Sequence, residues 1–281
     1  MATEAPHPTA GTHPSDRIDT TVAHPARRYN YLLGGKDNFQ ADRDSADEMA
    51  AAFPTIRTTA LENRRFLQRA VGYLTREAGL RQFLDIGTGI PTADNTHEVA
   101  QRIAPQTRVV YVDNDPIVLA HARALLTSSP EGATAYIDAD LRDPEKILAH
   151  PELRRTIDLG QPVALMLVAI LHFLPDPDDP YALVRHLVDA LPSGSYLAAS
   201  HATHEYLPPP VAEKAKATTR NGGPEELLRM RSRAEITRFF DGLEVVEPGI
   251  VSVAQWRAEQ EAEPRPSVAD VSMYGAVARK P

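Results

Sequence analysis

The feature that most constrains this fold is a series of buried strands alternating with helices. The segment Pro162–Leu171 is apolar throughout, and it is too short for a membrane span of about 20 residues. Strands are predicted at Gln82–Ile86, Arg108–Val112, Thr134–Ile137, Pro162–Ala169, Ser195–Ser200, Leu243–Val246 and Met273–Ala278, with helices at 92–103, 116–126, 144–148 and 179–191. Buried strands joined by helices indicate an α/β fold with a parallel sheet covered on both faces.

The rest of the chain suggests a simple domain organisation. Residues 1–16 lack apolar periodicity, which predicts a disordered tail. Residues 17–80 predict an N-terminal helical cap and a first long helix over 57–78. Residues 81–281 then form the main domain, with a polar insertion near 205–224.

The composition excludes several classes of protein. The 281 residues include no cysteine, which rules out disulfide frameworks, thiolate metal sites and a cysteine nucleophile. A formal net charge of -8 argues against nucleic acid as a partner, because phosphate binding needs clustered Lys and Arg. We identify no secretory signal and no membrane span, and we expect a cytoplasmic protein with a small-molecule partner and no membrane partner.

A glycine turn follows the first predicted strand, in the sequence Asp85-Ile86-Gly87-Thr88-Gly89-Ile90-Pro91. Glycine lets the backbone approach a ligand because it has no Cβ. The first strand–helix turn of a doubly wound sheet is also the usual nucleotide site. The alternative is a tight turn without a ligand, since a Gly-x-Gly pair alone is weak evidence.

Acidic side chains follow the next two predicted strands. Asp113 lies 24 residues after Gly89, where a carboxylate can accept both hydrogens of a ribose diol. Asp140 follows the third strand and can accept from an adenine amino group. The alternatives are that Asp113 or Asp115 caps the next helix and that 138–143 is a solvated loop. Together, three strand ends favour an adenosine cofactor.

Two other nucleotide motifs do not fit. A dinucleotide fingerprint needs a third glycine where Thr92 stands, which argues against NAD(P). Gly34-Gly35-Lys36 lacks the spacer and the Ser or Thr of a P-loop, which argues against ATP hydrolysis.

The segment Asp85–Gly89 resembles motif I of the class I S-adenosylmethionine-dependent methyltransferases. More narrowly, the chain resembles a bacterial family of uncharacterised S-adenosyl methyltransferases, formerly a domain of unknown function. The matching stretches are Ala26–Phe39, Gln82–Pro91, Val110–Pro116, Asp140–Pro144, Leu171–Phe173 and Gly194–His201. The resemblance implies a doubly wound, mostly parallel seven-stranded sheet of the Rossmann-like methyltransferase type, with an antiparallel last strand. It also implies S-adenosyl-L-methionine as cofactor.

The resemblance assigns contacts along the whole cofactor. We expect Gly87, Thr88 and Gly89 at the methionine part, Asp85 at the turn or the ammonium group, Asp113 at the ribose, and Asn114, Asp140 and Leu141 at the adenine. Pro91 replaces the third glycine of the broader methyltransferase pattern.

Two histidines follow the fourth and fifth predicted strands. We expect His172 to act as a base or as a hydrogen-bond partner of the substrate, and His201 is the second catalytic candidate. The alternative for His172 is a histidine that bonds only to backbone. His201 and His204 form a His-x-x-His pair, but only Glu205 accompanies them, so we expect no metal.

The N-terminal segment 26–39 carries many specific polar side chains. We expect it to cover the cofactor, and its candidate substrate-pocket residues are Tyr29, Tyr31, Lys36 and Asn38. Arg28, or Arg64 on the long helix, is expected to pair with the cofactor carboxylate. The alternative is plain packing of this segment on the sheet edge.

These observations predict methyl transfer from S-adenosylmethionine to O or N of a small molecule. The reaction is an in-line attack on a sulfonium-bound carbon, so the protein mainly supplies proximity and alignment. The alternatives are an NAD(P)-dependent oxidoreductase and a non-catalytic regulator that binds S-adenosylmethionine.

Overall fold

The computed structural model describes residues 18–125, 127–213 and 228–281. Their strands are β1 (Gln82–Ile86), β2 (Arg108–Asp113), β3 (Ala133–Asp138), β4 (Ala164–Val168), β5 (Tyr196–Ala202), β6 (Glu244–Val245), β7 (Val251–Ser252) and β8 (Met273–Arg279). They form one sheet in the order β3-β2-β1-β4-β5-β8-β6, with β7 paired to β8 off this path. The expected tail and residues 214–224 of the expected insertion lie outside the described residues.

The sheet confirms the architecture expected from the sequence. Strands β1 to β5 pair in parallel, whereas β8 runs antiparallel to β5 and β6. The path contains the seven expected strands, and the two-residue strand β7 is an addition. Because the strand order reverses between β1 and β4, the carboxyl ends of these strands flank the crevice where α/β sheets bind ligands.

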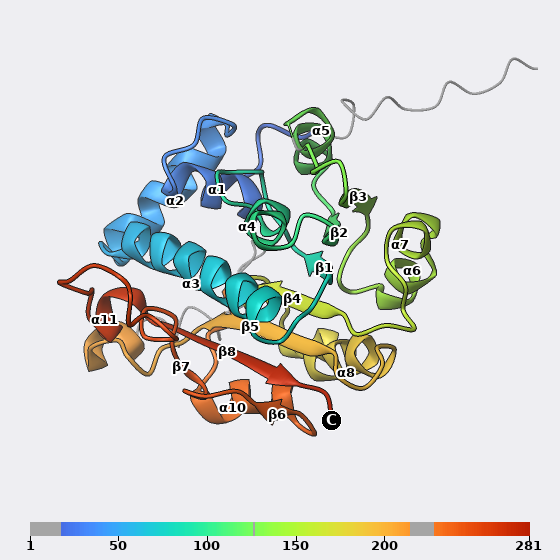
Figure 1. The fold of residues 1–281 in the computed structure, drawn as a ribbon. Coiled ribbons are helices and arrows are strands. Elements are labelled where there is room, and N and C mark those ends of the chain that lie inside the picture. Colours follow the sequence, from blue (N-terminus) through green and yellow to red (C-terminus); the bar gives the residue numbers. More distant parts are fainter. Residues whose placement is uncertain (1–17, 126, 214–227) are drawn as a thin grey trace, which may run out of the picture.

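Helices cover both faces of the sheet (Figure 1). They are α1 (Pro25–Leu32), α2 (Gln40–Ala52), α3 (Ile56–Arg76), α4 (Thr96–Ile103), α5 (Pro116–Leu125), α6 (Pro144–Ala149), α7 (Pro151–Thr156), α8 (Pro180–Asp189), α10 (Arg233–Thr237) and α11 (Val268–Val271), with short 3-10 helices η2 (Leu171–Phe173), η3 (Asp176–Asp178) and η4 (Arg238–Phe240). All five side chains of β1 are buried. Leu84 packs in the layer of α6, α7 and α8, whereas Phe83 packs in the layer of α3 and α4.

Helix α4 begins later than the sequence suggested. We expected a helix from residue 92, but it begins at Thr96. Asn95 is its N-cap and forms a capping box with Glu98. Since Asp94 also has a positive φ of 60°, residues 91–95 form a loop beside the glycine turn instead of a first helical turn.

The N-terminal helices pack beside the first end of α3 (Figure 1). Leu32 of α1, Ala46 of α2 and Ala60 of α3 form a small buried cluster of their own. Arg27 ties α1 to the main sheet, because its Nε lies 3.2 Å from the Asp115 carboxylate just after β2. The cap is thereby placed over the carboxyl edge of the sheet.

Candidate active site

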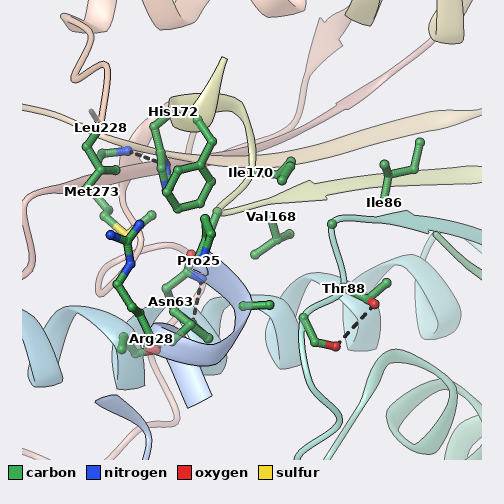
Figure 2. Close-up of a pocket in the computed structure, with 18 of the residues that line it drawn as sticks. Pro25, Arg28, Asn63, Ile86, Thr88, Val168, Ile170, His172, Leu228 and Met273 are labelled. Atoms are coloured by element: carbon green, nitrogen blue, oxygen red, sulfur yellow. Dashed lines mark hydrogen bonds between the residues drawn. The ribbon is translucent and has the colours of Figure 1, made fainter. Parts of the chain in front are cut away.

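One cavity at the carboxyl edge collects most of the residues singled out from the sequence (Figure 2). Those that line it are Arg28, Tyr29, Arg64, Asp85, Gly87, Thr88, Gly89, Asp113, Asn114, Asp140, Leu141 and His172. In the view of Figure 2, Thr88 and Ile86 lie toward one end, and His172 and Met273 lie toward the other. The cavity therefore has a glycine-turn end and an end formed by β8, η2 and the cap.

The glycine turn is anchored to the end of the second strand. Gly87 and Gly89 have φ values of +75° and +65°, which favour glycine. A Cβ at Gly87 would also lie 2.6 Å from the Ile170 side chain. The Gly89 amide donates to Asp113 Oδ2 at 2.9 Å, so the turn and the acidic strand end are one unit.

Asp113 anchors the glycine turn and also lines the cavity. Its second oxygen accepts from the Asp115 amide at 3.0 Å, so Asp113 also fixes the backbone just before α5. Burial raises the pKa of Asp113, against hydrogen bonds from Asp115 and Gly89 that lower it. Each carboxylate oxygen can accept a further hydrogen bond on the cavity side.

Asp85 and Arg64 bring opposite charges to the glycine-turn end. Burial raises the pKa of Asp85 to about 6, although the Thr96 hydroxyl, 2.6 Å away, and the Arg64 charge both lower it. Arg64 donates from Nη2 to the Ala93 carbonyl and to Asn95 Oδ1, each at 3.0 Å. Its Nε is buried without a hydrogen-bond partner, which leaves a donor for a ligand anion.

The third strand end forms a polar cluster at the rim. Asn114 donates to Asp140 Oδ2 at 2.9 Å. The other Asp140 oxygen accepts from the Arg142 amide at 2.8 Å, and Arg142 also reaches Asp178 at 2.7 Å. The backbone after β3 is thereby fixed where Leu141, which is buried, meets the cavity.

His172 faces the cavity, but it is a weak base. It is 5% exposed, and its Nδ1 accepts from the Ala202 amide at 3.4 Å. Burial, with a smaller contribution from the Arg231 charge, lowers its pKa to about 3. A neutral imidazole with this pKa removes protons poorly near neutral pH, and because Nδ1 accepts from the amide, the ring proton lies on Nε2.

Four predicted site residues do not line this cavity. His201 is buried behind His172, because Nδ1 donates to the Ala202 carbonyl at 2.7 Å and Nε2 accepts from Arg231 at 3.0 Å. Lys36 is exposed, and the Tyr31 hydroxyl donates to Asp47 on the outer side of the cap. Asn38 instead holds the turn after α1, because its Nδ2 donates to Asn30 Oδ1 and the Gly35 carbonyl.

Several cavity residues were not singled out from the sequence. Asn63 carried a usable signal, because it lies seven residues before Ala70 on the buried face of α3, where an apolar residue is expected. Met273, Leu228 and Phe53 carried none, since their place depends on how distant segments meet at the cavity.

Within the described ranges, no group of three or more His, Asp or Glu side chains is arranged to hold a metal ion. None of the helices described is long and apolar enough to cross a membrane.

The sheet order, the glycine turn after β1 and the acidic ends of β2 and β3 define a class: α/β proteins that bind an adenosine cofactor at this edge. Residues 11–281 match the model of the S-adenosyl methyltransferase family, and the chain belongs to this family. It is therefore an S-adenosylmethionine-dependent methyltransferase, and the oxidoreductase alternative is set aside.

Solved structures agree with this family. A DUF574 family protein from Streptomyces avermitilis MA-4680 is 51% identical, with a TM-score of 0.86 and coverage of 94% of this chain and 100% of that chain. A proposed methyltransferase from Thermobifida fusca YX is 45% identical, with a TM-score of 0.83 and coverage of 93% and 96%. An O-methyltransferase family protein from Burkholderia thailandensis (13% identity, TM-score 0.50, coverage 89% and 63%) resembles the fold alone. A search of curated proteins found no match.

Proposed function

We propose that the carboxyl-edge cavity holds S-adenosylmethionine beside a small acceptor whose oxygen or nitrogen receives the methyl group. The observation that carries this proposal is the gathering of three acidic strand ends, a glycine turn and the unpartnered Arg64 Nε around one cavity. The proposed setting is the cytoplasm, as expected from the sequence.

The polar groups of the cavity match the charges along the cofactor. Arg64 would pair with its carboxylate and Asp85 with its ammonium group, because these two side chains are close enough to influence each other electrostatically. Asp113 would accept from the ribose hydroxyls. Asn114 and Asp140 would lie at the adenine, whose amino group needs an acceptor. Arg28 also lines the cavity and donates to the Ser45 hydroxyl at 3.1 Å, so it is placed nearer the cap.

When bound, the cofactor supplies a methyl group already activated by a positive sulfur. The side chains then have to orient the acceptor and exclude water. His172 is the group we assign to orientation, because no described residue bonds to its Nε2 and, with Nδ1 accepting from the Ala202 amide, the neutral ring carries its proton on Nε2. It would donate this N–H to a lone pair of the acceptor molecule instead of acting as a base.

The acceptor end of the cavity favours an apolar small molecule. Its apolar lining comes from the cap, η2, β8 and the segment before α10: Leu32, Met49, Phe53, Ile56, Phe173, Leu228, Met230 and Met273. Flat or branched apolar acceptors bury well against such side chains. Tyr29, the one proposed substrate-pocket residue that lines the cavity, adds a phenol that is already bonded to the Ala60 carbonyl at 3.0 Å.

Thermal unfolding with S-adenosylhomocysteine tests the proposed site. At a hundred times its Kd, a ligand that binds only the native state adds about 2.7 kcal/mol of stability. For a chain of this size, the Tm should rise by roughly 5–10 °C. NADH is the matched control, and it should leave the Tm unchanged. A shift with NADH but none with S-adenosylhomocysteine would contradict the proposal.

A further inference from the structure

A chain of hydrogen bonds runs from the cap to the end of β4. The Ala169 amide donates to Ser200 Oγ at 2.9 Å, and the Ser200 hydroxyl donates to Asn63 Oδ1 at 2.6 Å. The Asn63 Nδ2 then donates to the Tyr29 hydroxyl at 3.1 Å, which itself donates to the Ala60 carbonyl at 3.0 Å. Each hydroxyl donates once and accepts once, so the direction of the whole chain is fixed.

The hydrogen-bond chain ends at a residue with a strained backbone conformation. The β4–β5 ladder ends where Val168 pairs with Ser200, and the next residue, Ala169, has a φ of 58°. This left-handed conformation is unfavourable for a residue with a Cβ. Ser200 Oγ supplies the acceptor that the ladder no longer offers to the Ala169 amide.

The strained residue sets the direction of one wall of the cavity. Ile170 and His172 follow it within three residues, and Figure 2 shows Val168, Ile170 and His172 along one side of the cavity. Ile170 packs so closely on the glycine turn that a Cβ at Gly87 would lie 2.6 Å from its side chain. The bond from the Ala169 amide to Ser200 Oγ holds this conformation and with it the direction of the wall.

We infer that Ser200 and Asn63 are positioning residues, which hold the Ala169–His172 wall against the glycine turn and connect it to Tyr29 of the cap. Asn63 and Ser200 are 2% and 1% exposed, so water does not substitute for either partner. The inference rests on the proposed function only in assigning this wall to the cofactor and acceptor. The hydrogen-bond chain itself belongs to the free protein.

Ser200→Ala tests the inference with two readouts. Calorimetry should show an affinity for S-adenosylhomocysteine lowered about tenfold, the size of one lost hydrogen bond. In the free protein, the NMR signal of the Ile170 δ1 methyl should move. Ala169→Gly should restore both, because glycine adopts a positive φ without the Ser200 bond. The double variant should bind within about threefold of Ala169→Gly alone, which is the non-additivity expected of coupled residues.

Ser195→Ala is the matched control on the same strand. Ser195 is equally buried, and its Oγ accepts from the Val163 amide at 3.1 Å at the other end of β4. It should lower stability but leave the affinity and the Ile170 signal unchanged. If Ser200→Ala does not fold, Tyr29→Phe breaks the chain while keeping the ring, and it should move the same signal.

The outcomes separate the two proposals. If the wild-type protein fails to bind S-adenosylhomocysteine, the proposed function is overturned. The Ile170 methyl signal of the free protein then still tests whether the hydrogen-bond chain holds the wall. Equal effects of Ser200→Ala and Ser195→Ala, or no rescue by Ala169→Gly, overturn the positioning role.

Discussion

At the scale of single residues, the raised pKa of Asp85 makes both the stability of the fold and the binding of a cationic ligand depend on pH. Its raised pKa means that the folded protein binds this proton more tightly than the unfolded chain, whose value is near 3.8. The protonated carboxyl therefore contributes its full share of stability below pH 3.8, and this contribution is lost as the pH rises through about 6. A cationic ligand group beside Asp85 binds more tightly as the pH rises, because it needs the ionised carboxylate.

We therefore expect the affinity for S-adenosylhomocysteine to rise about tenfold from about pH 5 to about pH 7. Asp85→Asn should bind more weakly near pH 7 and should lose this dependence. Calorimetry at three pH values measures both. Asp143→Asn, which changes the cap of α6 outside the cavity, is the control and should keep the wild-type dependence. A flat profile for the wild type would remove Asp85 from the ammonium site.

The residue scale also shows what local sequence cannot tell. We expected both histidines just after a strand, but His201 lies within β5, and only His172, in η2, lines the cavity. The difference comes from Arg231, which is fully buried and occupies the Nε2 atom of His201. Because Arg231 lies 30 residues further along the chain, no local pattern around either histidine predicts this outcome.

At the scale of elements, α1 is fastened to the segment that carries Asp113. Arg27 and Asp115 are 7% and 2% exposed, and the Arg27 Nε lies 3.2 Å from the carboxylate. The His24 Nδ1 lies 3.0 Å from the same oxygen. Leaving a buried carboxylate without its partner costs free energy, so this ion pair stabilises the position of the cap.

Arg27→Ala should lower the free energy of unfolding by about 3–5 kcal/mol. Hydrogen exchange should also become faster in α1, since the helix loses its bond to the segment after β2. Arg155→Ala is the control, because its pair with Glu152 is 72% and 41% exposed, and exposed pairs contribute about 0–1 kcal/mol. Equal losses in the two variants would show that the Arg27 pair does not hold the cap.

Elements with strong periodicity or capping signals were predictable. Helix α3 lies at 56–76 against an expected 57–78, and α10 begins at a capping box formed by Ser232 and Glu235. Helices α7 and α11 and strand β7 were missed. Each is short, and β7 exists only because β8 provides a partner for it. Pairing of this kind is set by tertiary contacts and not by a pattern within two residues.

At the scale of the whole molecule, the sheet was predictable because buried parallel strands leave long apolar runs. The glycine-turn end of the cavity was predictable for a related reason: its residues come from consecutive strand ends, which topology brings to one edge. The acceptor end was not, since it combines α1, α2, η2 and β8 from across the chain.

The two ends of the cavity predict a pattern of protection across the molecule. On addition of S-adenosylhomocysteine, amide exchange should slow after β1, after β2 and after β3, and in α1, because these segments line the cavity proposed to hold the ligand. Helix α8 packs in the same layer as α6 and α7 and does not line the cavity, so its amides should exchange at an unchanged rate. Hydrogen exchange read by mass spectrometry measures both. Slowing confined to α8 would place the ligand elsewhere.

The close approach of Gly87 and Ile170 has an evolutionary consequence. A larger residue at 87 must overcome both the positive φ and the 2.6 Å approach to the side chain at 170. Descendants of this gene can therefore exchange the glycine only after position 170 has become smaller. Among diverged homologues, substitutions at these two sites should accordingly appear as a pair, with the change at 170 preceding the change at 87.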